Sequence, residues 1–133
     1  MRVLPHLTTT LRAEGDARPE VAWERYAELA RWPQWSPQIT GVEAGGPRLV
    51  AGLTGTVRGP AGVRIAFTVL EVDEAARTWS WRASLGPVVL VLHHGVEARA
   101  GGCATWLRTR GLPPVVLAYA PLARLALGRL VAA

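Results

Sequence analysis

Residues 19–39, PEVAWERYAELARWPQWSPQI, combine a helical pattern with an abrupt aromatic corner. Pro19 suits the first position of a helix, and charged residues alternate with apolar ones that recur at helical spacing. The apolar residues are Ala22, Trp23, Tyr26, Leu29 and Ala30. The pattern predicts an amphipathic helix over residues 19–30, which ends because Pro33 and Pro37 impose a tight corner.

Short β-type runs lie on both sides of this segment. Residues 6–11 are rich in threonine and stop before the turn-forming residues Glu14, Gly15 and Asp16. Beyond the corner, glycine and proline separate six β-prone runs at hairpin spacing, which are 39–43, 53–58, 63–73, 78–85, 88–97 and 104–110. Together these runs predict a curved, seven-stranded antiparallel sheet.

The last segment predicts a long and mostly apolar helix. It begins at Pro113 and Pro114 and is expected to be bent or broken near Pro121, which removes one backbone hydrogen bond. One stripe of this helix is formed by Val116, Tyr119, Ala123, Leu127 and Leu130. The predicted class is therefore α+β, with the order β-α-α-β6-α, counting the corner as a second short helical element.

A sheet that buries one face needs a cover, and only the first helix with its corner and the C-terminal helix can supply it. One helix seldom fills a strongly curved sheet of seven strands. We therefore expect a cavity between the two layers, of the pre-formed apolar kind that binds small molecules.

Length and composition limit the remaining possibilities. The 133 residues suit a single domain over residues 1–133, and with half of them apolar the chain should fold around one core. The formal net charge is +5, but the fifteen arginines are spread from Arg2 to Arg129 rather than clustered, which argues against nucleic-acid binding. The most hydrophobic stretch, 112–123, is too short for an integral membrane segment.

The chain offers no pattern of a metal or cofactor site. Cys103 is the only cysteine, and the adjacent His93 and His94 must point to opposite sides of a strand. No phosphate loop, dinucleotide fingerprint or nucleophile elbow is present in the sequence. We expect no metal and no cofactor, and a cytoplasmic location because residues 1–11 do not resemble a signal peptide.

Three parts of the sequence carry a family resemblance. They are residues 21–39, the strand pair that contains Glu71-Val72-Asp73 and Trp79-Ser80-Trp81, and residues 101–107, GGCATWL. In this pattern the chain resembles the START-like, or SRPBCC, superfamily and its polyketide cyclase/dehydrase-like branch. The resemblance implies a helix-grip fold with a hydrophobic cavity. It also implies a role in lipid transport, in hormone binding, or in cyclising and dehydrating polyketide intermediates without a cofactor.

The candidate ligand-binding residues are mainly aromatic. Trp79 and Trp81 share one face of their strand, which is either cavity wall or a contact surface for another molecule, and we expect cavity wall. Trp32 and Trp35 could stack a planar ligand, although aromatic corners more often only pack. The expected lining consists of Trp32, Trp35, Phe67, Trp79, Trp81, Leu92 and Leu107.

Candidate catalytic groups are few. Both faces of the strand over residues 88–97 are apolar apart from the histidines, so the choice of His94 as the inward one rests on the resemblance. In a cavity His94 could act as a general acid or base, or it could simply be satisfied by a backbone carbonyl. Tyr119 and Arg108 could assist it, but core packing and the solvated surface are their more ordinary locations.

Three functions remain open from the sequence. The first is binding of a hydrophobic small molecule, such as a lipid, polyketide or aromatic metabolite, as a carrier or sensor. The second is a cofactor-independent cyclase, aromatase or dehydratase that uses His94 or Tyr119. The third is a protein-interaction module that presents an exposed tryptophan patch. The protein is expected to be a monomer or a homodimer.

Overall fold

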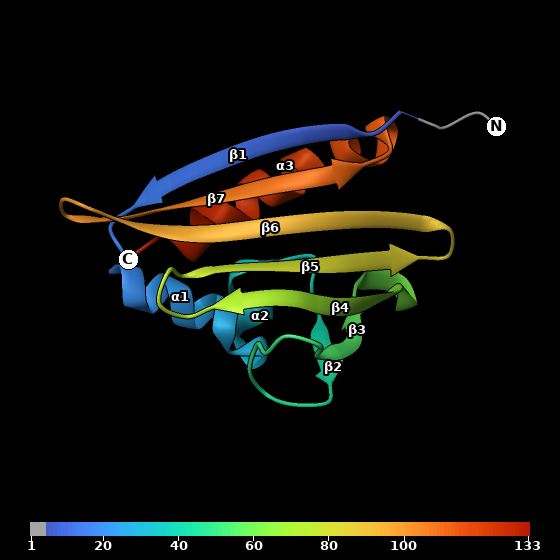
Figure 1. The fold of residues 1–133 in the computed structure, drawn as a ribbon, viewed down its shortest axis with the longest axis horizontal. Coiled ribbons are helices and arrows are strands. Elements are labelled where there is room, and N and C mark those ends of the chain that lie inside the picture. Colours follow the sequence, from blue (N-terminus) through green and yellow to red (C-terminus); the bar gives the residue numbers. More distant parts are fainter. Residues whose placement is uncertain (1–4) are drawn as a thin grey trace.

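The computed structural model describes residues 5–133, in which one antiparallel sheet of seven strands packs against helices (Figure 1). The strands are β1 (Leu7–Gly15), β2 (Gly41–Ala44), β3 (Thr54–Arg58), β4 (Arg64–Asp73), β5 (Thr78–Leu85), β6 (Val88–Arg99) and β7 (Gly102–Gly111). The helices are α1 (Pro19–Ala27), α2 (Trp32–Trp35) and α3 (Pro113–Leu130), with short 3-10 turns η1 (Leu29–Arg31) and η2 (Pro60–Gly62). The expectation about a signal peptide was based on residues 1–11, and residues 1–4 lie outside the part of the chain that the structure describes.

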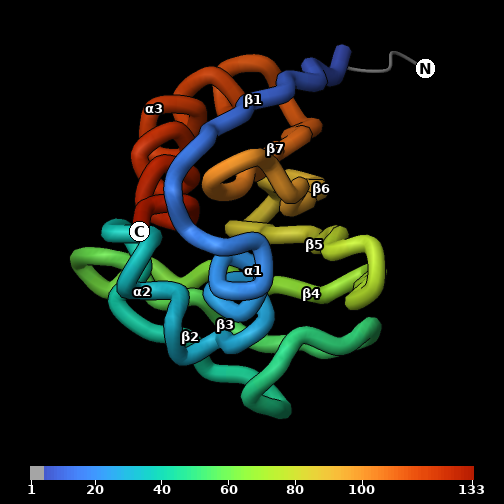
Figure 2. Tube along the Cα trace, turned by 90° about the vertical axis from the view of Figure 1, so that its left-hand side faces the viewer, coloured from blue at the N-terminus to red at the C-terminus, as the bar shows by residue number. Residues whose placement is uncertain are grey.

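The strands follow the order β1-β7-β6-β5-β4-β3-β2, and every neighbouring pair is antiparallel. The sheet curves from β1 round to β2, and α3 lies on its concave side against β1 and β7 (Figure 2). The predicted α+β class, the seven-stranded sheet and the order β-α-α-β6-α are thus confirmed.

The boundaries differ most at the first strand and first helix. The strand predicted over residues 6–11 continues to Gly15, because β1 pairs with β7 along its whole length. A side chain at position 15 would overlap the backbone of Val131, so glycine lets the end of the chain pack onto β1. The helix predicted over residues 19–30 ends at Ala27, since Glu28 is extended and bridges to Arg48.

The C-terminal helix starts on two prolines, as predicted, and runs to Leu130 without interruption. The helix is not broken at Pro121. Proline leaves the carbonyl of Leu117, four residues earlier, without its helical donor, but Pro121 and Leu117 both lie on the exposed side of α3, where water can bond to this carbonyl. Arg25 satisfies the end of the helix by donating to the carbonyls of Leu130 and Ala132, both at 2.7 Å. No helix in the described part of the chain is long and apolar enough to cross a membrane.

The sheet has two distinct ends (Figure 1). The β4–β5 and β6–β7 turns, α1 and the C-terminus lie at one end, on the left of the figure, which we call the hairpin end. The β5–β6 turn and the start of α3 lie at the other, on the right, together with η2, and we call this the mouth end.

Candidate functional site

A cavity of about 250 Å³ lies between the sheet and α3. Its walls come from α2, from strands β3 to β6 and from one side of α3. Aromatic lining is supplied by Trp32, Trp35, Trp79, Trp81 and Tyr119, and aliphatic lining by residues such as Ile39, Val57, Ile65, Leu90, Leu92 and Val115. Small-molecule sites in proteins are likewise concave and mostly apolar, which makes this cavity the candidate site.

The lining is almost free of polar groups. Within residues 5–133, no Asp, Glu, Lys or Arg side chain lines the cavity, and its polar members include Ser36, Gln38 and His94. The Oε1 atom of Gln38 is buried and finds no hydrogen-bond donor among the described residues. A buried polar atom without a partner is costly, so this atom favours a bound group that donates a hydrogen bond.

The two tryptophans of the aromatic corner bond to the last turn of α1. The indole N–H of Trp32 donates to the carbonyl of Tyr26, and that of Trp35 donates to the carbonyl of Arg25, each at 2.8 Å. These carbonyls have no partner within the helix because they belong to its last turn. The two tryptophans therefore cap α1 and line the cavity at the same time.

Trp32 is the centre of the aromatic cluster. Its ring lies 5.4 Å from Trp81, 5.7 Å from Trp79 and 5.8 Å from Phe67, measured between centroids. Trp79 in turn stacks on the imidazole of His94, with centroids 4.5 Å apart and planes inclined by 9°. Aromatic pairs of this kind stabilise the fold by about 0.5–1.5 kcal/mol each beyond the area that they bury, so the cluster forms a packed wall.

Both nitrogens of His94 are engaged by neighbouring side chains. The indole N–H of Trp81 donates to Nε2 at 3.0 Å, which places the imidazole proton on Nδ1. Nδ1 then donates to the hydroxyl of Tyr26 at 3.2 Å, and that hydroxyl donates to Oγ1 of Thr105 at 2.7 Å. Thr105 closes the chain on the carbonyl of Gly95 at 2.8 Å.

This buried chain keeps His94 neutral. Desolvation by burial, together with the charge of the neighbouring His93, lowers the pKa of His94 to about 3. A histidine that is neutral at physiological pH and bonded at both nitrogens has no lone pair or proton available for a ligand. The geometry therefore assigns His94 to the structure of the cavity wall rather than to proton transfer.

Tyr119 presents a different environment from α3. Burial raises the pKa of its phenol to about 12, so the hydroxyl stays protonated. Within the described residues its hydroxyl has no hydrogen-bond partner, although its ring lines the cavity. Tyr119 can thus offer a neutral hydrogen-bond donor or acceptor to a molecule inside.

Residues 6–133 match the family model for polyketide cyclase / dehydrase and lipid transport proteins. The chain belongs to this family. The match spans nearly the whole sequence and confirms the START-like resemblance, and the family is associated with hydrophobic ligands or a cyclase-like role. No curated protein sequence matches the chain.

Solved structures share the fold of this family member at low sequence identity. The crystal structure of Ara h 8.0201 is similar with a TM-score of 0.73 and 13% identity, over 95% of this chain and 98% of that chain. The protein XoxI from Bacillus cereus is similar with a TM-score of 0.70 and 16% identity, over 96% of this chain and 94% of that one. Both likenesses support the helix-grip architecture.

Most of the site residues that the sequence predicted line the cavity. Trp32, Trp35, Trp79, Trp81, Leu92, His94 and Tyr119 all line it. His94 is the inward histidine, since it is 3% exposed whereas His93 lies on the outer face. The carbonyl partner considered for His94 is replaced by the side chains of Trp81 and Tyr26.

Three predicted residues lie elsewhere. Arg108 does not line the cavity, because it lies opposite the exposed His93 in the β6–β7 register and its guanidinium lies over the ring of Trp106 on the outer face. Phe67 and Leu107 are buried but do not line the cavity. Phe67 instead supports the aromatic wall from behind, 5.9 Å from Trp81.

The prediction missed Tyr26, which is fully buried at the centre of the polar chain. Its signal was a tyrosine on the apolar stripe of an amphipathic helix, where a buried hydroxyl needs a partner. The partner could not be named, because Thr105 is 79 residues away in the sequence.

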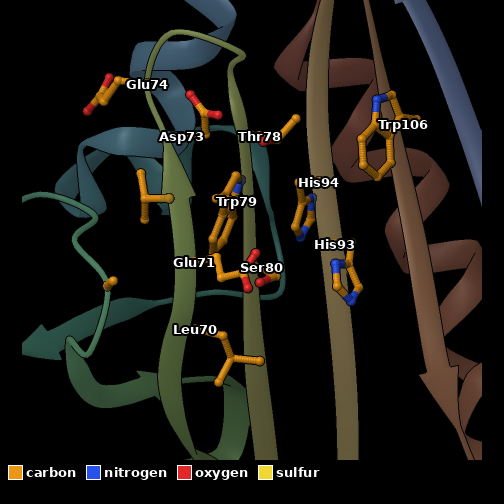
Figure 3. Close-up of a pocket in the computed structure, with 12 residues that line it drawn as sticks. Leu70, Glu71, Asp73, Glu74, Thr78, Trp79, Ser80, His93, His94 and Trp106 are labelled. Carbon is orange, nitrogen blue, oxygen red and sulfur yellow. The ribbon is translucent and has the colours of Figure 1, made fainter.

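A second hollow of about 700 Å³ lies on the outer face of the sheet (Figure 3). It is broad and open, and polar side chains such as Glu71, Ser80 and His93 line it from neighbouring strands (Figure 3). Residues 5–133 contain no cluster of three His, Cys, Asp or Glu side chains placed to hold a metal ion. The candidate site is therefore the apolar cavity between the sheet and α3, not this hollow.

Proposed function

We propose that the protein binds an uncharged hydrophobic small molecule in the cavity, as a carrier or sensor. The observation that carries this proposal is an apolar, largely aromatic lining without a formally charged side chain in the described residues. Burying a charged ligand group there without a countercharge would be strongly unfavourable. A ligand with a hydroxyl or N–H would satisfy Oε1 of Gln38.

The volume limits the size of the ligand. About 250 Å³ exceeds the roughly 150 Å³ cavity that accommodates benzene but falls below the range of about 300–1,000 Å³ typical of drug-sized ligands. A molecule of one or two rings with a polar substituent suits this space. A two-chain lipid would have to leave much of its length outside.

The other two functions have less support. A cofactor-independent cyclase or dehydratase needs a poised acid or base, yet His94 is engaged and Tyr119 stays protonated, so Tyr119 could act only by hydrogen bonding. A protein-interaction module would present exposed tryptophans. Five of the six tryptophans are buried, and Trp106 is half-buried.

The test uses two probes that share a naphthalene ring and differ in the charge of the substituent. We expect 2-naphthol, which is neutral at pH 7, to bind at least about tenfold more tightly than the anionic 2-naphthoate, measured by quenching of tryptophan fluorescence. Equal or tighter binding of 2-naphthoate would refute the neutral-ligand proposal. Native mass spectrometry of protein purified from its own host, compared with the denatured chain, would then reveal the mass of the natural ligand.

Gln38→Leu tests the orienting role of the amide. We expect this change to weaken 2-naphthol binding while leaving naphthalene binding within about twofold, because only 2-naphthol has a hydroxyl to donate. Ser84→Ala is the matched control at a lining position with a different polar group. Equal loss for both probes would assign Gln38 to packing alone.

A further inference from the structure

The cavity is surrounded at the mouth end by three segments of the chain. They are residues 56–66 around η2, residues 82–91 around the β5–β6 turn, and residues 108–122 from β7 into α3. Each segment contributes to the lining, for example through Val57, Leu85 and Val115. Any molecule that approaches this end of the cavity meets the surface of these three segments.

This surface is unusually apolar. Eight large hydrophobic side chains are exposed in the described residues, and five of them lie in the three mouth segments. The five are Val63, Leu85, Val89, Leu117 and Leu122, with Leu117 the most exposed at 59%. Exposed apolar groups that gather around an opening indicate contact with another phase or molecule.

The same segments carry only positive charge. They contain five arginines, Arg58, Arg64, Arg82, Arg108 and Arg110, and no aspartate or glutamate. Glu43 of the neighbouring β2 pairs with Arg58 and Arg64, while Arg82, Arg108 and Arg110 form no salt bridge within the described residues. All ten acidic residues of the chain lie outside these segments.

The acidic residues of the hairpin end are largely neutralised locally. Arg48 bonds to both Glu24 and Glu74, at 2.7 and 2.9 Å, and Arg12 pairs with Glu97 at 2.9 Å. The positive charge that acidic residues do not balance is therefore concentrated in the three segments of the mouth end. A surface with this polarity attracts anionic partners over a distance of about one Debye length.

We propose that the mouth end is a docking surface for an anionic lipid bilayer. The exposed apolar side chains next to η2, in the β5–β6 turn and on α3 enter the interface, and Arg82 and Arg110, which form no salt bridge in the described residues, contact the lipid headgroups. This combination of apolar insertion and basic residues is what interfacial binding requires. The proposal concerns the surface and does not depend on which molecule occupies the cavity.

A second copy of the chain fits this surface less well than a bilayer. A symmetric dimer through the mouth end would bring the same patch of both copies together. Two patches that each carry five arginines and no acidic residue of their own would then meet, with only the already paired Glu43 beside each. The charge pattern therefore favours an anionic partner.

Vesicle flotation tests the docking surface. We expect the protein to float with vesicles of phosphatidylcholine containing about 30% phosphatidylglycerol, and at least about tenfold less with pure phosphatidylcholine. Raising the ionic strength from about 0.05 to about 0.5 M should weaken the binding, because the screening length shortens. Equal binding to both vesicles, or none at low salt, would overturn the proposal.

Variants locate the surface. Arg82→Gln with Arg110→Gln should weaken binding to anionic vesicles by roughly fivefold for each arginine removed. Arg18→Gln with Arg129→Gln makes the same charge change at the hairpin end and should leave most of the binding. Val63→Ser with Leu117→Ser should also weaken it, unlike Val50→Ser with Leu70→Ser, which removes two exposed side chains outside the mouth segments. Equal losses in both members of a pair would overturn the assignment.

Two measurements separate this proposal from the binding function. Titration with 2-naphthol in the absence of vesicles reports the cavity alone, and none of the substituted residues lines it. Sedimentation velocity of the free protein reports self-association. A dimer that Val63→Ser with Leu117→Ser dissociates would assign the surface to a second copy and overturn the bilayer proposal.

Discussion

The indole N–H of Trp81 donates to Nε2 of His94 over 3.0 Å, although the two residues lie on neighbouring strands and 13 positions apart. The bond fixes the tautomer of His94, and the imidazole proton then points to Tyr26. Trp81, which lines the cavity, thus fixes the protonation pattern of His94, the residue that the sequence suggested as a catalytic acid or base. The consequence for stability can be measured as a function of pH.

The first prediction concerns acid. The pKa of His94 is about 3 in the folded protein, against about 6.5 in an unfolded chain. Below pH 6.5 the unfolded chain binds a proton at His94 that the folded protein does not bind. The contribution of His94 to the free energy of unfolding is therefore fully present above pH 6.5 and is lost as the pH falls toward 3. The free energy of unfolding should decrease by about 1.4 kcal/mol per pH unit from this group.

Urea unfolding of the wild type and of His94→Gln checks this prediction. His94→Gln should be less stable at pH 7, because it disturbs the buried chain, but its stability should fall less steeply. Between pH 7 and pH 5 the wild type should lose roughly 2 kcal/mol more than the variant. Parallel curves for the two proteins would show that His94 does not carry the effect.

The second prediction compares Tyr26, which is fully buried, with Tyr119, which is half-buried in the cavity wall. Tyr26→Phe removes the acceptor of His94 Nδ1–H and the donor to Thr105, and should lower the free energy of unfolding by about 1–3 kcal/mol. Tyr119→Phe removes a hydroxyl without a partner in residues 5–133 and should change stability by less than about 0.5 kcal/mol. Chemical denaturation at pH 7 measures both changes. Similar losses would contradict the assignment of Tyr26 to the polar chain.

The fold could be predicted from the sequence because most of its turns are marked by glycine and proline. The strand predicted over residues 78–85 has the same limits in the structure, where it is followed by Gly86, a residue with positive φ. The predicted strand stopped before the true end of β1, because residues 12–15 are mostly polar or small and owe their strand conformation to pairing with β7. Local patterns cannot report such non-local pairing.

The site was predictable only in part for a similar reason. The tryptophans of β5 follow from side-chain alternation, and their shared inner face was expected. Which face of β6 points inward depends on its register with β5 and β7, where His94 pairs with Trp79 and Leu107, so Arg108 could not be excluded from sequence. Polar partners distant in sequence, such as Thr105, were equally inaccessible.

The third prediction concerns Gly95 on the outer face. A Cβ atom at position 95 would overlap the indole of Trp106, which lies directly over this glycine from the neighbouring strand. Gly95→Ala should therefore destabilise the protein by about 1–3 kcal/mol. Adding Trp106→Ala should relieve the clash, so the double variant should lose less than the sum of the two single changes. Strict additivity in thermal unfolding would contradict this contact.

The last prediction separates the two roles of Trp81. Trp81→Phe keeps an aromatic ring in the cavity wall but removes the donor to His94, so it should lower stability by about 1–3 kcal/mol and change 2-naphthol binding little. Trp81→Ala removes both the donor and the ring, and should cost about 3–5 kcal/mol in stability.

Trp81→Ala should also weaken 2-naphthol binding, because it removes the surface that packs against the probe and enlarges the cavity. Titrations at a temperature where both variants remain folded provide the comparison, with Trp23→Phe as a control, since Trp23 is buried but lies outside the cavity lining. Unchanged affinity in Trp81→Ala would remove Trp81 from the binding wall. A loss of affinity in Trp81→Phe as large as in Trp81→Ala would instead show that the orientation of His94, and not the ring of Trp81, shapes the cavity.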